Sequence, residues 1–134
     1  MPLSIFVIMD TAYSGDLADD ARQGSVWIVA SPNNEEAARH ARAAIARECP
    51  MPDRITTFTA DVDDDLALSS LLTTIRAHHG ELAASSSWDS IHVIGRTIGH
   101  SRPSRIATAL GVHDVELVER PSGFSIRRSR SERR

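Results

Sequence analysis

Two glycines and several polar side chains follow a strongly apolar segment in residues 95–104, GRTIGHSRPS. Glycine lets a backbone approach a phosphate closely, and an arginine or histidine beside it can neutralise the negative charge. The spacing matches neither a P-loop, which ends in Gly-Lys-Ser/Thr, nor the Gly-x-Gly-x-x-Gly loop of dinucleotide-binding proteins. The segment therefore indicates a place where an anion could bind, and a plain turn after a strand is the alternative explanation of its glycines.

An anion bound there would also meet residues 31–34, which follow another apolar segment, because the carboxyl ends of parallel strands share one edge of a sheet. The side chains that we expect to contact it are Ser31, Asn33, Arg96, His100, Ser101 and Arg102. No cofactor motif accompanies these residues, so no cofactor is expected. The function implied is a small phosphate- or nucleotide-binding enzyme with its site at the carboxyl ends of the strands.

Four aspartates lie within residues 61–65, DVDDD. Carboxylates this close can hold magnesium or act as an acid and base pair. Metal-dependent phosphoryl enzymes also need a nucleophile and a positioned cation, which this segment does not supply. An acidic helix start, favoured by the helix dipole, is the simpler explanation. A third explanation is a surface that meets a basic partner.

Adjacent histidines, His78 and His79, also suggest a metal, but neighbours on a helix point about 100° apart. The chain has no nearby cysteine or glutamate at zinc spacing, so we expect no metal. His79 continues an apolar helix stripe and His78 does not. His92 lies in an apolar segment and is expected to be a core or interface histidine, while Cys49 is expected to be unreactive. No Gly-x-Ser-x-Gly elbow marks a nucleophile, so no catalytic residue is assigned.

Charge is distributed unevenly along the chain, whose net charge is −3. Residues 10–65 carry twelve acidic side chains and five arginines, whereas residues 127–134 carry five arginines and one glutamate. An acidic first half favours a basic protein partner. The short arginine tail and the six aromatic residues do not favour specific nucleic-acid binding. All basic residues are arginine, which together with frequent alanine suggests a GC-rich, bacterial coding sequence.

Apolar segments predict four buried strands, at residues 3–9, 26–30, 55–59 and 91–94. Two further segments, residues 115–118 and 124–127, flank an Arg-Pro-Ser-Gly turn and predict an antiparallel hairpin.

Helices are predicted between the strands. Ser31 is expected to cap a helix that runs to Glu48 and ends before two prolines. A leucine-rich stripe predicts a second helix, which one of the clustered aspartates caps and Gly80 ends. A short third helix is expected at residues 103–110, and residues 10–24 fit either two helical turns or a long loop.

Strands that alternate with helices predict right-handed βαβ units and a largely parallel sheet. The expected fold class is α/β: a three-layer sandwich around a mostly parallel sheet of 5–6 strands, with a C-terminal antiparallel hairpin at the edge. One domain is expected over residues 1–128, followed by a disordered Arg-rich tail at residues 129–134. The single cysteine fits a reducing compartment, and neither a signal peptide nor a membrane span is evident, so a cytoplasmic location is expected.

Three functions are consistent with these patterns. The first is a non-enzymatic protein-binding or inhibitory module, such as an immunity or antitoxin protein that neutralises a basic nuclease through an acidic surface. Its partner-binding residues would be Asp16, Asp19, Asp20, Asp61, Asp63, Asp64 and Asp65. The second is the small phosphate- or nucleotide-binding enzyme described above. The third is a homodimer, or another homo-oligomer, that pairs through the terminal hairpin.

Overall fold

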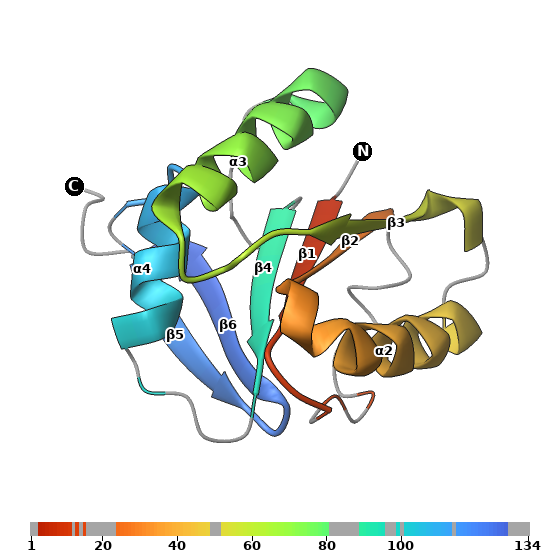
Figure 1. The fold of residues 1–134 in the computed structure, drawn as a ribbon. Helices are drawn as coiled ribbons and strands as arrows, with labels where there is room; N and C mark the ends of the chain where they lie inside the picture. Colours follow the sequence, from red (N-terminus) through yellow and green to blue (C-terminus); the bar gives the residue numbers. More distant parts are fainter. Residues whose placement is uncertain are drawn as a thin grey trace.

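The structure is a computed structural model, and it describes residues 3–11, 13, 15, 24–48, 52–80, 89–95, 99, 101–113 and 115–128. Within these residues six strands form one sheet in the order β3-β2-β1-β4-β6-β5 (Figure 1). The strands are β1 Leu3–Ile8, β2 Ser25–Ala30, β3 Ile55–Thr59, β4 Asp89–Ile94, β5 Val115–Arg120 and β6 Gly123–Arg128. Every residue of β1 is buried, as expected of a central strand that is covered on both faces.

The sheet is mixed. Strands β1 to β4 run parallel, while β6 pairs antiparallel with β4 and β5 pairs antiparallel with β6. In the parallel part, Ile5 lies opposite Trp27 on one side and Ile91 on the other. The predicted hairpin is confirmed, and its strand β5 forms one edge of the sheet.

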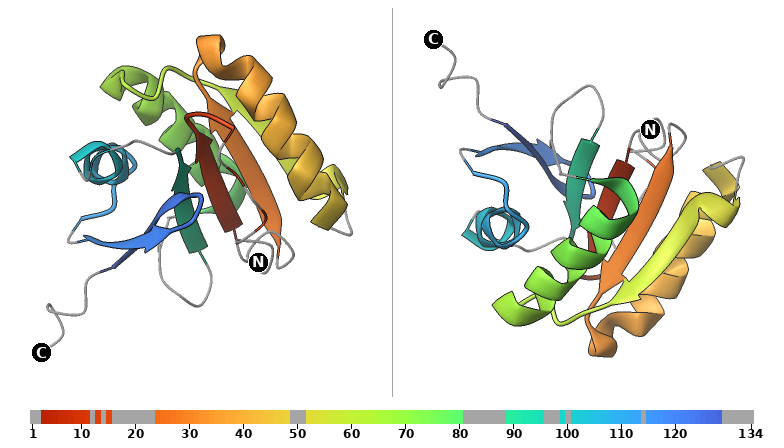
Figure 2. Two further views of the ribbon diagram at one scale, coloured as in Figure 1. Left: turned by 90° about the horizontal axis from the view of Figure 1, so that it is seen from below. Right: turned by 90° about the horizontal axis from the view of Figure 1, so that it is seen from above.

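Three α-helices in the described ranges cover the two faces of this sheet. Helix α2 (Glu35–Glu48) packs on one face, and α3 (Asp65–His79) and α4 (Ser101–Ala109) pack on the other (Figure 2). Alternation along the strands supplies both cores: in β1, Ile5 faces α3 and α4, whereas Phe6 faces α2. The predicted three-layer α/β sandwich is therefore confirmed, with six strands where 5–6 were expected.

The start of the α2 segment differs from the prediction. Residues Pro32–Asn34 form a short 3₁₀ helix, η1, and α2 begins only at Glu35. The Ser31 side chain makes no capping hydrogen bond to this helix. Its hydroxyl accepts a hydrogen bond from the backbone N–H of Val62 instead, at 3.1 Å, and this tertiary contact replaces the cap.

The predicted ends of the next helix are confirmed. Asp64 is the N-cap of α3, and its carboxylate accepts from the backbone N–H of Leu66. Gly80 ends the helix with a φ of 86°, and its N–H donates to the carbonyl of Arg76. No helix in the described part of the chain combines the length and the hydrophobicity needed to cross a bilayer.

Candidate functional site at the carboxyl ends of the strands

The carboxyl ends of the four parallel strands meet at one edge of the sheet. Ser31 follows β2, residues 60–64 follow β3 and Gly95 follows β4. The chain leaves β1 toward β2 and β3 on one side, whereas β4 lies on the other side of β1. The backbone N–H of Met9 donates to the carbonyl of Ile94 at 2.8 Å, so β1 and β4 remain paired up to this edge. In open α/β sheets, a reversal of strand order such as this one forms the crevice where ligands bind.

The aspartate-rich loop after β3 is held by its own hydrogen bonds. The carboxylate of Asp61 accepts from the backbone N–H of Asp63 at 3.0 Å, and the carboxylate of Asp64 caps α3. Val62, between Asp61 and Asp64 in sequence, is buried in the core beneath α3, and its N–H donates to Ser31. Asp61 and Asp64 therefore have local structural roles, as the acidic-helix-start explanation requires.

Asp63 and Asp65 bind two arginines of α4 instead. Arg102 donates two hydrogen bonds to the Asp63 carboxylate, from Nε at 3.0 Å and from Nη2 at 2.5 Å. Arg105 donates to the backbone carbonyl of Asp63, and its Nη2 lies 3.1 Å from Oδ1 of Asp65. We call these four residues the α3–α4 ion-pair cluster. It joins two helices that are separated in sequence by β4.

The ion-pair cluster is only partly shielded from water. Side-chain exposure is 51% for Asp63 and 42% for Arg102. Exposed ion pairs are typically worth 1 kcal/mol or less, roughly, because water and salt screen them. The two-point contact between Arg102 and Asp63 adds geometric specificity to that modest energy. The cluster therefore orients the start of α3 against α4 more than it stabilises the fold.

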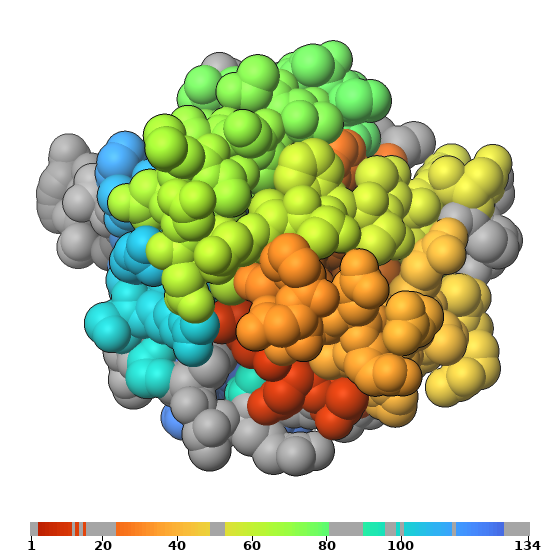
Figure 3. All heavy atoms as spheres, in the orientation of Figure 1, coloured from red at the N-terminus to blue at the C-terminus, as the bar shows by residue number. Residues whose placement is uncertain are grey.

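Leu66 lies in the first turn of α3, beside the ion-pair cluster. It is the exposed large hydrophobic residue of the described chain, with 79% of its surface accessible. Asp64 and Asp65 precede it directly, and both are exposed. The start of α3 lies beside the start of α2, where Glu35 and Glu36 are exposed as well (Figure 3). An apolar side chain in water thus directly follows two exposed carboxylates in the first turn of α3.

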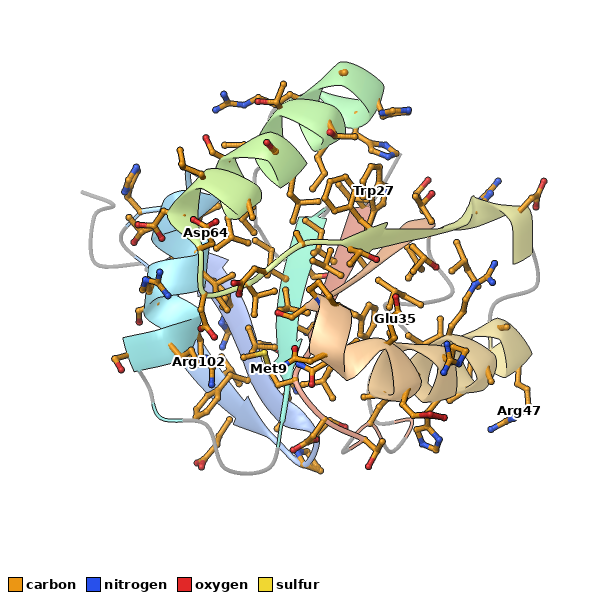
Figure 4. All side chains as sticks on the ribbon, viewed as in Figure 1. Met9, Trp27, Glu35, Arg47, Asp64 and Arg102 are labelled. Atoms are coloured by element: carbon orange, nitrogen blue, oxygen red, sulfur yellow. The ribbon has the colours of Figure 1, made fainter. Side chains whose placement is uncertain are left out.

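The structure brings together residues that the sequence assigned to two different hypotheses. Arg102, a predicted anion-binding residue that is labelled in Figure 4, is bound to Asp63, a predicted partner-binding residue. Ser31 contacts the aspartate loop through Val62. Asn33, in η1, and Ser101, at the start of α4, are exposed. The remaining predicted residues lie outside the described residues: Asp16, Asp19, Asp20, Arg96 and His100.

Two residues of this site were not predicted from the sequence. Arg105 follows Arg102 by three positions on α4, and this spacing places both on one helix face. Leu66 falls outside the stripe of buried residues that starts at Leu68, and an apolar residue off the stripe is expected to be exposed. The arginine spacing and the position of Leu66 can both be seen in the sequence. The sequence does not show that the two arginines contact the start of α3.

Metal binding finds no support at this site. Among the described residues, no three histidine, cysteine, aspartate or glutamate side chains gather closely enough to hold a metal ion. His92, a predicted core histidine, is 2% exposed, and its Nδ1 lies 2.7 Å from the Ser125 hydroxyl. Cys49 lies outside the described residues. The site therefore offers charged and apolar recognition groups around a reversal of strand order.

Comparison with protein-family models and with curated proteins gives no match to this chain.

Proposed function

We propose that the chain is a protein-binding module whose partner is a basic protein, and that the partner contacts the edge where α2 and α3 begin. The observation that carries the proposal is the 79% exposure of Leu66 among carboxylates. Contact surfaces between proteins combine a desolvated centre with a polar rim, and charge on the rim steers the partner and selects it.

The start of α3 supplies both parts of such a surface. Burying one leucine side chain contributes about 1.5–3 kcal/mol, enough for a central anchor. Four aspartates lie within residues 61–65, against the two arginines of the ion-pair cluster, so the carboxylates outnumber the cations around this anchor. A partner with exposed lysines or arginines matches that balance.

The ion-pair cluster contributes to binding indirectly. Arg102 and Arg105 fix the first turn of α3 against α4, and Ser31 fixes the preceding loop against β2. A surface held in place before binding loses less conformational entropy when the partner arrives. A bacterial immunity or antitoxin protein that covers a basic nuclease is the class of inhibitor that we propose.

The test compares three immobilised proteins in a capture from lysate of the source cells: wild type, Leu66→Asp and Ala43→Asp. Ala43 is exposed on α2, away from its first turn, and serves as the matched control. We expect the wild type and Ala43→Asp to retain the same basic protein at low salt and to release it at high salt. Leu66→Asp should lose it while keeping an unchanged melting temperature, since exposed positions usually shift stability by about 0.5 kcal/mol or less. Equal retention by Leu66→Asp would contradict the proposal.

The strand order favours a second candidate function, binding of a phosphate-bearing ligand in the crevice between β1 and β4. In this case the ligand would compete with Asp63 for Arg102. A nucleotide or sugar phosphate should then raise the melting temperature, Arg102→Ala should abolish the shift, and Asp63→Asn should enlarge it. No shift across a panel of such ligands would contradict this function.

A further inference from the structure

A cavity of about 340 Å³ lies at the other end of α3, between its last turns and strands β2 and β3. Four rings line it, those of Trp27, Phe58, His78 and His79. The length of α3, 15 residues at about 1.5 Å each, separates this cavity from Leu66 by roughly 20 Å. The cavity is therefore distinct from the site proposed above.

Side chains alternate between the two faces along β2 and β3, and the helical repeat of α3 brings its last turn over the same face. Together these two patterns place the lining residues around one space. Trp27 of β2 lies opposite Thr56 of β3, and Phe58 follows two residues later on the same face of the sheet. The buried stripe of α3 ends at Ile75, and His79, four residues on, continues it over Trp27. The cavity thus opens at the edge of the sheet, because β3 is an edge strand.

Hydrogen bonds hold the rings in place. The indole N–H of Trp27 donates to Nε2 of His79 at 3.0 Å, beneath the last turns of α3 (Figure 4). Nδ1 of His78 lies 2.9 Å from the carbonyl of Thr74. The ring centre of Trp27 is 5.8 Å from that of each histidine and 6.1 Å from that of Phe58. Trp27 is 3% exposed, so it forms the floor and the other rings form the walls.

Polar groups lie around these rings. Arg54 supplies a guanidinium and Thr56 supplies a hydroxyl, while the hydroxyl of Thr74 donates to the carbonyl of Ser70. Asp53 is the one carboxylate among the lining residues. An apolar, aromatic space with a few converging polar groups is the usual form of a small-molecule site, and this volume lies at the lower end of the usual range. A guanidinium favours a carboxylate, which it can bind with two hydrogen bonds.

We propose that this cavity binds a small planar aromatic carboxylate of one or two rings. The ring of the ligand packs against Phe58 and the histidine rings, and its carboxylate binds Arg54. The hydroxyl of Thr56 donates the remaining polar contact.

The test uses indole-3-acetate as the probe and ¹⁵N-labelled full-length protein. The chain has two tryptophans, so the Trp27 indole resonance is assigned by comparison with Trp88→Phe. We expect indole-3-acetate to shift the Trp27 resonance in a saturable manner. The neutral indole-3-acetamide should bind about tenfold more weakly, because it lacks the charge that Arg54 recognises.

Two variants and one control separate a site from a surface effect. Arg54→Gln should weaken binding of indole-3-acetate about tenfold but leave binding of the amide unchanged. Phe58→Leu, which keeps an apolar side chain, should weaken binding of both probes. Arg42→Gln, an exposed arginine of α2 on the opposite face of the sheet, should change neither. An unperturbed Trp27 resonance at millimolar probe, or equal binding of acid and amide, would overturn the proposal.

Discussion

Gly123 determines how closely β6 approaches β4. Its φ is 154°, and a Cβ at this position would lie 2.0 Å from the carbonyl oxygen of Val93. No flexible side chain can move aside, because the obstructing atoms are backbone. A glycine is therefore required where the hairpin joins the parallel part of the sheet.

We expect Gly123→Ala to lower the free energy of unfolding by about 3 kcal/mol or more, measured by urea denaturation. Gly80→Ala is the matched control, since Gly80 also has a positive φ, of 86°, but nothing lies within 4 Å of its Cβ position. That control should cost only about 1–2 kcal/mol of backbone strain. Equal losses in the two variants would show that β6 can shift away from β4.

The hydrogen bond from Trp27 to His79 requires a lone pair on Nε2 of the histidine. The indole N–H of Trp27 thus has its acceptor on the last turn of α3, and this contact joins β2 to the end of that helix.

We expect Trp27→Phe to lower the free energy of unfolding by about 1–3 kcal/mol, measured by urea denaturation, because the buried side chain becomes smaller and the hydrogen bond to His79 is lost. Trp27→Phe removes the donor and keeps a ring. An unchanged free energy of unfolding would mean that this contact does not stabilise the end of α3 against β2.

Asp64 is the N-cap of α3 and determines where this helix begins. We expect Asp64→Ala to lower the free energy of unfolding by about 1 kcal/mol, because the N–H of Leu66 loses its acceptor. Asp64→Asn should cost far less, since asparagine caps about as well as aspartate. Chemical denaturation of the three proteins distinguishes these values. A large loss of stability in the asparagine variant would mean that the negative charge of Asp64, and not its capping hydrogen bond, stabilises α3.

The ion-pair cluster joins α3 to α4, and its energy is measurable with a double-mutant cycle. Asp63→Ala, Arg102→Ala and the double variant should give a coupling energy of about 0.5–1 kcal/mol, as for other exposed pairs. The coupling energy should fall at 1 M salt, where the Debye length is only about 3 Å. A zero coupling at low salt would mean that the contact does not orient the helices.

Local patterns predict most of the elements, since each depends on its own segment. The run of apolar residues in β1 and the apolar stripe on α3 predict which side chains are buried. The contacts that define the site join segments far apart. Ser31 and Val62 are 31 residues apart, and Arg102 and Asp63 are 39 apart. Ser31 has the sequence pattern of a cap, but the fold places Val62 within reach of its hydroxyl.

At the scale of the molecule, three places on its surface carry the proposals made above. The start of α3 presents Leu66 beside carboxylates, the strand order reverses between β1 and β4 at the same edge of the sheet, and the aromatic cavity lies at the far end of α3. Sequence patterning predicts the general edge for the first two features, because carboxyl ends of parallel strands must meet. It does not predict the third, which depends on where α3 ends over β2.

Site-specific crosslinking can trap a basic protein that contacts the start of α3. A photo-crosslinking phenylalanine analogue replaces Leu66 in one protein and Ala43 in another, and both are irradiated in the source cells. We predict one prominent adduct with a basic protein from position 66 and none from position 43. No adduct at position 66, or the same adducts from both positions, would contradict the proposed function.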